Sequence, residues 1–542
     1  MKILHIPFCY HPDPMGGTEV YVTTLAKELL ARGVQVVIAA SSETSGSYFY
    51  GDIPVRRFAI RQQVSDLREL YGEGWELAAN EFANILDEEQ PDVVHFHAFT
   101  SNVSLRLVRA AKARNLPVIY TYHTPTATCQ RGTMMRWGTA PCDGLMNLHD
   151  CARCTLEGLL QRGVGRWKMG DGNQKAESRK QKAEGRSQES GVRRILAHMV
   201  GSLPSAFGFQ LGRLGFRGGA WTALRMTELM KLRHATTRAW LAEVDHVVAM
   251  CEWVRQVLLR NGVPETKMTL CRQGISVKAE NRKQPGGVVE DFTGQGRLHG
   301  PRKSDTGNAE TLKTEIRKSE NRHLEAPHLG ALPSAERGRR QQLSTFNSQP
   351  STLRICFLGR LDPAKGVHIL IQALRALPQA SLRLDVYGIP QGKGGIEYAA
   401  TLRRKAEGDP RIGFHNPVPA ESVISLLSNY HLLAVPSQGL ETGPLVVLEA
   451  FAAGIPVMGS RLGGIAELVK DGENGILVQA NSIEAWAAAL ARLSREPELL
   501  KTLRLGIQPP RLIGDVADEM LALYNSIATL RPHTRNQLAR KA

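Results

Sequence analysis

Residues 431–478 read HLLAVPSQGLETGPLVVLEAFAAGIPVMGSRLGGIAELVKDGENGILV and predict a strand, a loop, a helix and a second strand. The opening run HLLAVPS is short, apolar and ended by Pro and Ser, which is typical of a strand buried on both faces of a parallel sheet. Gly443 and Pro444 open a helical pattern that stops at Gly454, and Pro near the first turn with Gly past the last is the usual helix asymmetry. This stretch therefore indicates an α/β protein.

Two acidic residues in this stretch are candidates for ligand binding. Ligands of an open α/β sheet bind at the carboxyl ends of its strands, so Glu441 is expected on a ligand-facing loop. Glu449 is expected inside the helix, about two turns further on. An ionised Glu in the apolar run LVVLEAFAA costs free energy unless it is hydrogen-bonded, and the hydroxyls of a sugar or a ribose would satisfy it. A capped or salt-bridged core position is the alternative for Glu449.

The spacing of these two glutamates, the following AFAAGIPV and the Gly-Gly pair at 463–464 resemble the donor-site signature of glycosyltransferase family four. Members of that family are retaining enzymes with the GT-B fold. The resemblance implies that Glu441 contacts the transferred sugar and Glu449 the nucleotide ribose. The family commonly has Gly-Phe-Gly after the first Glu, whereas this chain has Thr442-Gly443-Pro444, similar to a subgroup variant. The donor-binding residues implied here are Glu441, Gly443, Pro444, Leu445 and Glu449.

The segment LRICFLGRLDPAKG, residues 353–366, predicts a strand followed by a diphosphate-binding loop. Arg360 and Lys365 precede the helical pattern GVHILIQALRAL, so two cations and a helix N-terminus come together. Such a site could stabilise a pyrophosphate leaving group without a bound metal. The resemblance covers the string GRLDPAKG and implies this role, although each charge could also be an ordinary surface residue. The base of the donor is expected near residues 415–418, with Val418 among the binding residues.

In the N-terminal part, KILHI predicts a buried strand, and Gly16 and Gly17 precede the helical pattern TEVYVTTLAKELLARG. Glycines at a helix N-terminus let backbone amides approach an anion, although a glycine pair is also an ordinary turn. Further strands alternate with helices and predict one doubly wound domain. The resemblance implies that Gly16 and Gly17 face the donor phosphates and that His123, after PVIYTY, lies beside the reacting sugar. We expect His95 and His97 to be structural, with substrate contact as the alternative.

Four cysteines, Cys129, Cys142, Cys151 and Cys154, lie within 26 residues and end in a C-x2-C pair. In a cytosolic protein such a cluster favours a metal site over disulfides, because tetrahedral zinc accepts four thiolates. We therefore expect a structural zinc, with chance clustering or redox pairing as alternatives. The loop follows directly after His123, on the face where an acceptor would bind.

The formal net charge of +16 would suggest nucleic acid if it lay on one face of the folded part. However, residues 165–194 and 276–353 carry nine of these excess positive charges. Both segments are poor in apolar residues and are predicted to be disordered insertions. Related words recur in them, KAESRKQ at 175–181, KAEGRSQ at 182–188 and KAENRKQ at 278–284, which indicates one repeated genetic element. Aromatic residues are not interleaved with the basic ones, so nucleic-acid binding is not expected.

The chain is long enough for two or three domains, and it contains no apolar run of about 18 residues, so we expect a soluble protein without a spanning helix. Its start, MKILHIPFCY, has no leader pattern, which makes the cytoplasm the expected location. A peripheral contact with the inner face of the membrane is one interpretation of the basic positions among apolar residues, and a solvated helix face is the other. These positions are Arg213, Arg217, Arg225, Lys231 and Arg233.

The predicted fold class is therefore GT-B, with two doubly wound parallel-sheet domains facing across a cleft. The expected division of the chain is an acceptor-side domain over 1–275, an insertion over 276–353, a nucleotide-sugar domain over 354–515 and a crossover helix with a tail over 516–542.

The resemblance implies transfer of a hexose, with retention, from a UDP- or GDP-linked sugar to a saccharide or lipid-linked acceptor in cell-surface polysaccharide or glycolipid synthesis. His123, Glu441, Arg360 and Lys365 are the expected catalytic residues, and no cofactor is expected in catalysis. The alternatives are a catalytically impaired sugar-nucleotide-binding protein and, less favoured, a basic nucleic-acid binder.

Overall fold

The computed structural model describes most of the chain, namely residues 1–13, 16–60, 67–167, 195–213, 219–277 and 352–529. Both predicted insertions lie mainly outside these residues, since 168–194 and 278–351 are not described. The two large sheets described below belong to one compact unit of the chain, Met1–Ser276 with Ser351–Ala542.

The N-terminal sheet has eight strands in the order β10-β9-β6-β5-β1-β2-β4-β3. All neighbours pair in parallel except the edge strand β3, which is antiparallel to β4. The strands that follow β1 and those that follow β5 are added on opposite sides of the β1–β5 pair. This pair is therefore the topological switch point of the sheet. The strands are β1 (Lys2–Ile6), β2 (Gln35–Ser42), β3 (Gly46–Tyr50), β4 (Ile53–Ala59), β5 (Val93–Phe96), β6 (Val118–Tyr122), β9 (His246–Ala249) and β10 (Met268–Leu270).

Helices connect these strands and bury both faces of the sheet. Leu4, Val94 and Tyr120 belong to one apolar cluster and their neighbours Ile3 and Val93 to another, which explains the uninterrupted apolar runs of the central strands. The helices are α1 (Gly17–Ala31), α2 (Leu67–Tyr71), α3 (Glu76–Glu89), α4 (Leu105–Lys112), α5 (Leu148–Trp167), α7 (Ser205–Arg213), α8 (Gly219–Leu224), α9 (Met226–Glu243) and α10 (Glu252–Arg260).

The C-terminal sheet has six strands in the order β13-β12-β11-β14-β15-β16, and all of them are parallel. Its switch point is the β11–β14 pair, so the loops after these two strands are the expected place for a ligand. The strands are β11 (Leu353–Arg360), β12 (Leu382–Ile389), β13 (Ile412–His415), β14 (Leu432–Val435), β15 (Val457–Ser460) and β16 (Gly475–Val478).

The helices of this half follow the same alternation, and the stretch quoted first forms the predicted strand, loop, helix and strand. They are α12 (Val367–Arg375), α13 (Gly392–Ala406), α14 (Val423–Leu427), α15 (Leu445–Ala452), α16 (Gly463–Leu468), α17 (Ile483–Arg495) and α18 (Pro497–Leu505). The two halves together are two doubly wound α/β domains, as the resemblance implied.

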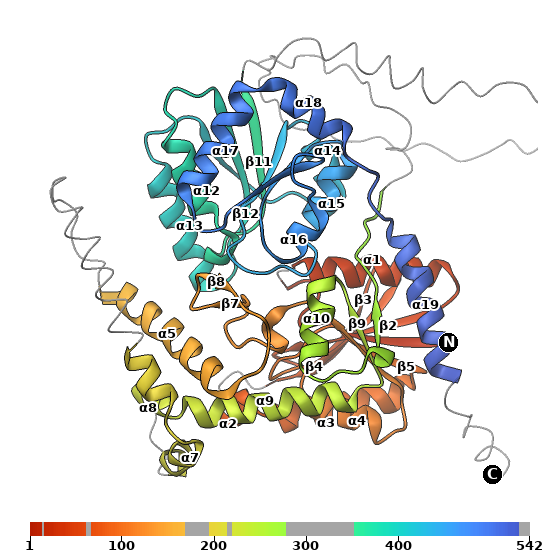
Figure 1. Cartoon of the computed structure of the whole chain (residues 1–542). Helices are drawn as coiled ribbons and strands as arrows, with labels where there is room; N and C mark the ends of the chain where they lie inside the picture. The colour runs from red at the N-terminus through yellow and green to blue at the C-terminus, as the bar shows by residue number, and fades with distance from the viewer. Residues whose placement is uncertain (14–15, 61–66, 168–194, 214–218, 278–351, 530–542) are drawn as a thin grey trace, which may run out of the picture. The chain divides into compact units, whose positions relative to one another are not determined.

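The last described helix, α19 (Ile513–Thr529), returns to the N-terminal sheet and packs beside α1 (Figure 1). Its buried face includes Val516, Met520 and Tyr524, which join the apolar cluster of Ile3 and Leu25. The helix begins three residues before the predicted boundary at 516, and the rest of the predicted tail, 530–542, lies outside the described residues. A helix that packs on a sheet more than 500 residues away in sequence ties the two ends of the chain together.

The predicted basic membrane face is not formed by α9, and this expectation is corrected. Arg225 is buried and pairs with Glu228 at 3.0 Å. Arg233 is buried over the ring of Phe99, and its burial lowers its pKa to about 10. Of Arg225, Lys231 and Arg233, only Lys231 is exposed. Of the two remaining positions, Arg217 lies outside the described residues, and the side-chain placement of Arg213 is not described.

No helix within the described ranges combines the length and the apolar character that crossing a membrane requires.

Candidate functional site

The switch point of the C-terminal sheet brings the predicted diphosphate-binding residues together with Glu441. Arg360 ends β11 and is exposed, and Lys365 lies in the short turn before α12. Gly366 between Lys365 and α12 has φ +73, and a Cβ there would lie 1.8 Å from the carbonyl oxygen of Pro436. Only glycine fits at this position, because the loop after β11 packs directly on the backbone after β14.

The carboxylate of Glu441 is bound on two sides. Its two oxygens lie 2.7 and 2.8 Å from the Lys365 ammonium, and the Ser437 hydroxyl donates to one of them. Burial by itself would raise the pKa of Glu441, yet the adjacent Lys365, the Ser437 hydrogen bond and the charge of Arg360 hold it below its usual value. Glu441 is therefore an ionised group held in one orientation.

The backbone of Glu441 is held as closely as its side chain. Its carbonyl oxygen accepts hydrogen bonds from the Gly464 amide at 2.6 Å and from the Trp253 indole at 2.8 Å. A Cβ at Gly464 would lie 2.7 Å from that oxygen, and one at Gly463, which has φ +48, would lie 3.0 Å from it. The glycine pair of the signature therefore permits α16 to pack on the Glu441 loop.

Glu449 differs from Glu441, because no hydrogen bond or ion pair to its carboxylate is found among the described residues. It lies half-buried in α15, two turns after the Glu441 loop, and burial raises its pKa to about 7. Gly443, with φ +136, and Pro444, at the N-cap, start this helix, and Leu445 is its first residue. The sequence-based alternative of a salt-bridged core Glu is thus not what this structure has.

The carboxyl edge of the N-terminal sheet carries a chain of three hydrogen-bonded histidines. His123 follows β6, and its Nε2 lies 2.9 Å from Nδ1 of His97. Nε2 of His97 in turn lies 2.9 Å from Nδ1 of His5. Burial lowers the pKa of His5 and of His123 to about 3, so these rings are neutral at physiological pH.

The end of this chain favours one tautomer of His123. Nε2 of His5 is buried without a hydrogen-bond partner, and an unpaired acceptor is less costly there than an unpaired N–H donor. Protons then lie on Nδ1 of His5 and Nδ1 of His97, each donating along the chain. His123 accepts at Nε2 and keeps its proton on Nδ1, where it can donate to a ligand hydroxyl.

The two sheet edges meet at His123. The Thr442 hydroxyl donates to the carbonyl oxygen of His123 at 2.7 Å, so the residue after Glu441 is bonded to the residue predicted beside the sugar. His95, in contrast, is structural, because its ring nitrogens bond Tyr524 and Thr121, both at 2.7 Å. One ring nitrogen from each of His5, His95 and His97 lies within 4.8 Å of the other two. Hydrogen bonds occupy every ring nitrogen of these three residues except Nε2 of His5.

The predicted phosphate contact of Gly16 and Gly17 meets a local competitor. The amide of Gly16 donates to the Glu19 carboxylate at 2.8 Å, which caps the start of α1. An anion would have to displace this negatively charged cap. Gly17 has open space where a side chain would be, so it could still admit a ligand.

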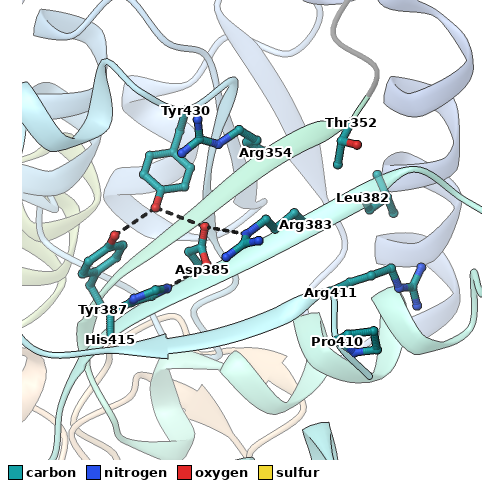
Figure 2. A pocket seen from close by; sticks show the side chains of 10 residues that line it. All are labelled: Thr352, Arg354, Leu382, Arg383, Asp385, Tyr387, Pro410, Arg411, His415 and Tyr430. Carbon is teal, nitrogen blue, oxygen red and sulfur yellow. Dashed lines mark hydrogen bonds and ion pairs between the residues drawn. The ribbon is translucent and has the colours of Figure 1, made fainter. Parts of the chain in front are cut away.

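The region predicted for the base contains a polar network. Figure 2 shows Asp385 between His415, Arg383 and Tyr430, and the Asp385 carboxylate lies 2.7 Å from Nε2 of His415. The His415 ring also stacks on Tyr387 at 4.7 Å between ring centroids. Val418 packs against the apolar cluster of α14 and α15. The sequence analysis places the base near His415, but it does not reveal that the ring is held by Asp385.

This network lines a cavity of about 570 Å³ that is separate from the Glu441 cluster. Arg354 and Leu382 line it near the starts of β11 and β12 (Figure 2), whereas Arg360 ends β11. Six residues of a strand span roughly 20 Å, so the cavity extends toward the opposite end of the sheet. Because of this position, we do not assign the cavity as the donor site, although it is large.

The four cysteines of the predicted zinc site line one small cavity together. Cys129 follows a turn of 3₁₀ helix, Cys142 follows the β7–β8 hairpin (Met135–Arg136 and Ala140–Pro141), and Cys151 and Cys154 lie at the start of α5. All four thiols are free and partly exposed. The loop also reaches the donor side, since the carbonyl oxygen of Thr133 accepts from the Leu440 amide at 2.9 Å.

Solved structures share the same arrangement of sheets. HepE of Anabaena, in complex with UDP and glucose, has a TM-score of 0.51 at 14% identity, covering 97% of this chain and 100% of that one. Sucrose-phosphate synthase of Thermosynechococcus elongatus has a TM-score of 0.55 at 17% identity, covering 98% and 100%. This likeness, together with the two parallel doubly wound sheets, shows the GT-B fold.

Family models give the narrower assignment. The model described as Glycosyltransferase Family 4 matches residues 15–145, and the model described as Glycosyl transferases group 1 matches residues 340–505. Together these matches cover more than half of the chain. These two domain matches and the GT-B fold support a glycosyltransferase of family four.

Two related sequences have the same name. The D-inositol 3-phosphate glycosyltransferase of Corynebacterium glutamicum is 37% identical over 183 residues, 32% of this chain and 43% of the relative. That of Corynebacterium urealyticum is 31% identical over 210 residues, 36% of this chain and 49% of the relative. The matched part thus spans less than half the length of these relatives.

Proposed function

We propose that the protein transfers a hexose from a nucleotide diphosphate sugar to an acceptor hydroxyl, with retention at the anomeric carbon. The observation that carries this proposal is the Lys365–Glu441 pair beside Arg360 at the switch point, joined through Thr442 to the neutral His123. Cations offset the charge that develops on a departing diphosphate, and neutral donors suit sugar hydroxyls.

Lys365 can serve the diphosphate without leaving Glu441. An ammonium has three N–H donors, and two of them point to the Glu441 oxygens. The third remains for a phosphate oxygen. Arg360 is exposed at the strand end, where its planar guanidinium could pair with two phosphate oxygens. No step in this scheme needs a metal ion.

Glu449 and His123 would hold the two ends of the donor. The unpaired Glu449 would accept hydrogen bonds from the ribose hydroxyls, which explains why a carboxylate is kept in an apolar helix. His123 would donate from Nδ1 to a sugar hydroxyl, because its low pKa makes it a neutral hydrogen-bond donor. Glu441 would orient the sugar. UDP is the first nucleotide to test, since HepE was solved with UDP and with UDP-glucose.

A lipid-linked acceptor at the cytoplasmic membrane face is the acceptor class we favour. Five exposed large apolar side chains gather over a short part of the chain, in the helical turns at 195–201 and in α7: Ile195, Leu196, Met199, Phe207 and Phe209. Exposed apolar patches of this kind mark contacts with lipid or protein. Polysaccharide or glycolipid synthesis would follow from such an acceptor.

Thermal stabilisation by UDP-glucose and by other UDP- and GDP-linked hexoses tests donor binding. A ligand at 100 times its Kd adds about 2.7 kcal/mol to the free energy of unfolding, so the correct donor should raise the midpoint clearly. Lys365→Ala should abolish this shift. Product analysis by NMR then reports the anomeric configuration. A protein that none of these donors stabilises, or an inverted product, would contradict the proposal.

Vesicle flotation tests the acceptor side. The double variant Phe207→Ser with Phe209→Ser should bind anionic phospholipid vesicles more weakly than wild type. Ile396→Ser is the matched control, because Ile396 is also exposed, at 62%, but lies on α13. Equal flotation of all three proteins would argue for a soluble saccharide acceptor.

A further inference from the structure

Four cysteines from three separate segments, namely two loop positions and the start of α5, line the same cavity in the N-terminal half. We propose that Cys129, Cys142, Cys151 and Cys154 bind one structural zinc ion, and that this ion braces the loop carrying Glu441. Four thiolates form a tetrahedral zinc site, and the C-x2-C pair at the start of α5 supplies half of it. Binding would release the thiol protons to solvent.

The backbone of the loop is folded to bring these segments together. Gly132 turns the chain after Cys129, with φ +71 and its amide bonded to the Cys129 carbonyl at 2.9 Å. The Cys142 amide donates to the Met134 carbonyl at 2.8 Å and closes the β7–β8 hairpin. The Trp137 amide at the hairpin tip points at the sulfur of Cys154, 3.4 Å away. Such an N–H donor would stabilise a zinc-bound thiolate.

Charges around the cavity fit the proposed centre. Zinc with four thiolates carries a net charge of about −2, and Arg131 and Arg136 both line the cavity. The Arg131 guanidinium lies 3.9 Å from the Cys154 sulfur and 2.9 Å from the carbonyl oxygen of that residue. Asp143 and Asp150 are the nearby acids, and Arg136 faces Asp143 at 3.7 Å.

Ligation requires the loop to close further. No three of the four sulfur atoms lie within 4.8 Å of one another. Zinc–sulfur bonds of 2.3 Å in a tetrahedron place the sulfurs about 3.8 Å apart, so the ion would draw the hairpin toward the first turn of α5. The four side chains already face one cavity, which makes this a local rearrangement.

The cysteine-containing loop contacts the loop that carries Glu441, so a bound ion would affect both. Thr133, between Cys129 and Cys142, accepts the Leu440 amide at 2.9 Å. A Cβ at Gly439 would lie 3.0 Å from the Thr133 carbonyl oxygen, so the two loops pack backbone to backbone. A zinc-closed loop would therefore hold the residue next to Glu441, and loss of zinc would free it.

Metal analysis of the purified full chain is the first test. We expect about one zinc per chain in wild type, and less than a tenth of that in Cys151→Ser and in Cys154→Ser. Cys9→Ser is the matched control, because Cys9 is also partly exposed but lies outside the cavity, and it should keep its zinc. Circular dichroism checks that the variants fold. Bound iron in place of zinc, or no metal, would overturn the proposal.

A second test needs no variant. In the wild-type protein the four thiols should resist alkylation until a zinc chelator is added, as mapped by peptide mass spectrometry. Hydrogen exchange at the Leu440 amide should then accelerate about tenfold or more, since its bond to Thr133 is lost with the closed loop. Four thiols that react before chelation, or a Cys151–Cys154 disulfide, would refute the zinc site. Unchanged exchange at Leu440 would refute the bracing of the Glu441 loop.

Discussion

The carboxyl edges of the two sheets carry opposite kinds of chemistry. At the C-terminal edge, Arg360, Lys365 and Glu441 form a charged cluster. At the N-terminal edge, His5 and His123 are neutral, because burial lowers their pKa to about 3. The comparison teaches that the surroundings of Glu441 are charged whereas the histidine chain that ends at His123 is neutral, which suits a donor with an anionic diphosphate and a neutral sugar. The predictions below test that separation.

Removing the lysine of the charged edge should have the largest effect. Lys365→Ala should lower kcat/KM by roughly 10²-fold or more, because one preorganised charge contact contributes on the order of 3 kcal/mol to the transition state. Steady-state kinetics with the nucleotide sugar provide the measurement. Arg360→Ala should lower kcat/KM similarly.

Lys501→Ala is the matched control for this change. Lys501 also forms an ion pair with a glutamate, Glu498 at 2.7 Å, but it is exposed on α18. Its removal should leave activity unchanged. Near-wild-type turnover of Lys365→Ala would place the charged edge outside the reaction.

Glu449 should make the stability of the folded protein depend on pH. Its pKa is raised to about 7 in the folded protein, from 4.5 in the unfolded chain. Between these values the folded state holds a proton that the unfolded state has lost, so stability falls as the pH rises and levels off above 7. Glu449→Gln should therefore be more stable than wild type at pH 8, by up to about 3 kcal/mol, and the gain should vanish toward pH 4.5. Urea unfolding at several pH values measures this.

The affinity for the nucleotide should change with pH in the opposite direction to the stability. Ribose hydroxyls donate to an ionised Glu449, so wild-type affinity for UDP should rise by about tenfold through pH 7, while that of Glu449→Gln stays flat. Glu421→Gln, at an exposed position, should behave like wild type in both experiments. A flat wild-type profile would show that Glu449 does not meet the ribose.

Substitutions in the histidine chain of the neutral edge should lower activity less than loss of Lys365. His97→Leu removes the hydrogen bond to His123 and should lower kcat/KM by about fivefold, the usual worth of one such bond. His97→Asn keeps an N–H close to the Nδ1 position and should restore most activity. Nitrogen NMR of His123 should show the Nδ1–H tautomer in wild type and a mixture in the Leu variant. The Nε2–H tautomer in wild type would reverse our proton assignment.

Thr442 joins the edges and should have the smallest effect. Thr442→Val keeps the shape but leaves the His123 carbonyl without its donor, which should lower the free energy of unfolding by about 1 kcal/mol and kcat by a few-fold. Thr442→Ser retains the hydroxyl and should recover both. If the Val variant equals wild type, the bond does not couple the edges.

Local patterns predicted the framework of this protein well. KILHI is β1, LRICFLGR is β11, and the helix opened by Pro444 is α15, because apolar runs and helix-end signals act over a few residues. The cluster of Arg360, Lys365 and Glu441 was also predictable, since two of them are neighbours in sequence and the third follows the adjacent strand of a parallel sheet.

Tertiary contacts decided what the local patterns left open. The basic residues Arg225 and Arg233 suggest a surface face in the sequence, yet folding buries them against Glu228 and Phe99. Gly16 suggests an anion site, yet its amide meets Glu19. The contact of Arg233 with Phe99 joins distant segments and depends on packing. Glu19 and Glu228, in contrast, each lie three residues along the chain from their partners, so these two pairings were open to prediction from helix spacing.

By itself, the sequence determined the order of strands and helices, the charged donor edge and the cysteines available to a metal, because these depend on residue type and short spacing. Only the tertiary structure decided that His5 and His97 support His123, that Trp253 and Thr442 hold the Glu441 loop, and that Glu449 has no described partner. These contacts join residues from 26 to 319 positions apart. Their geometry, and the pKa values that burial sets, arise only when the sheets are packed.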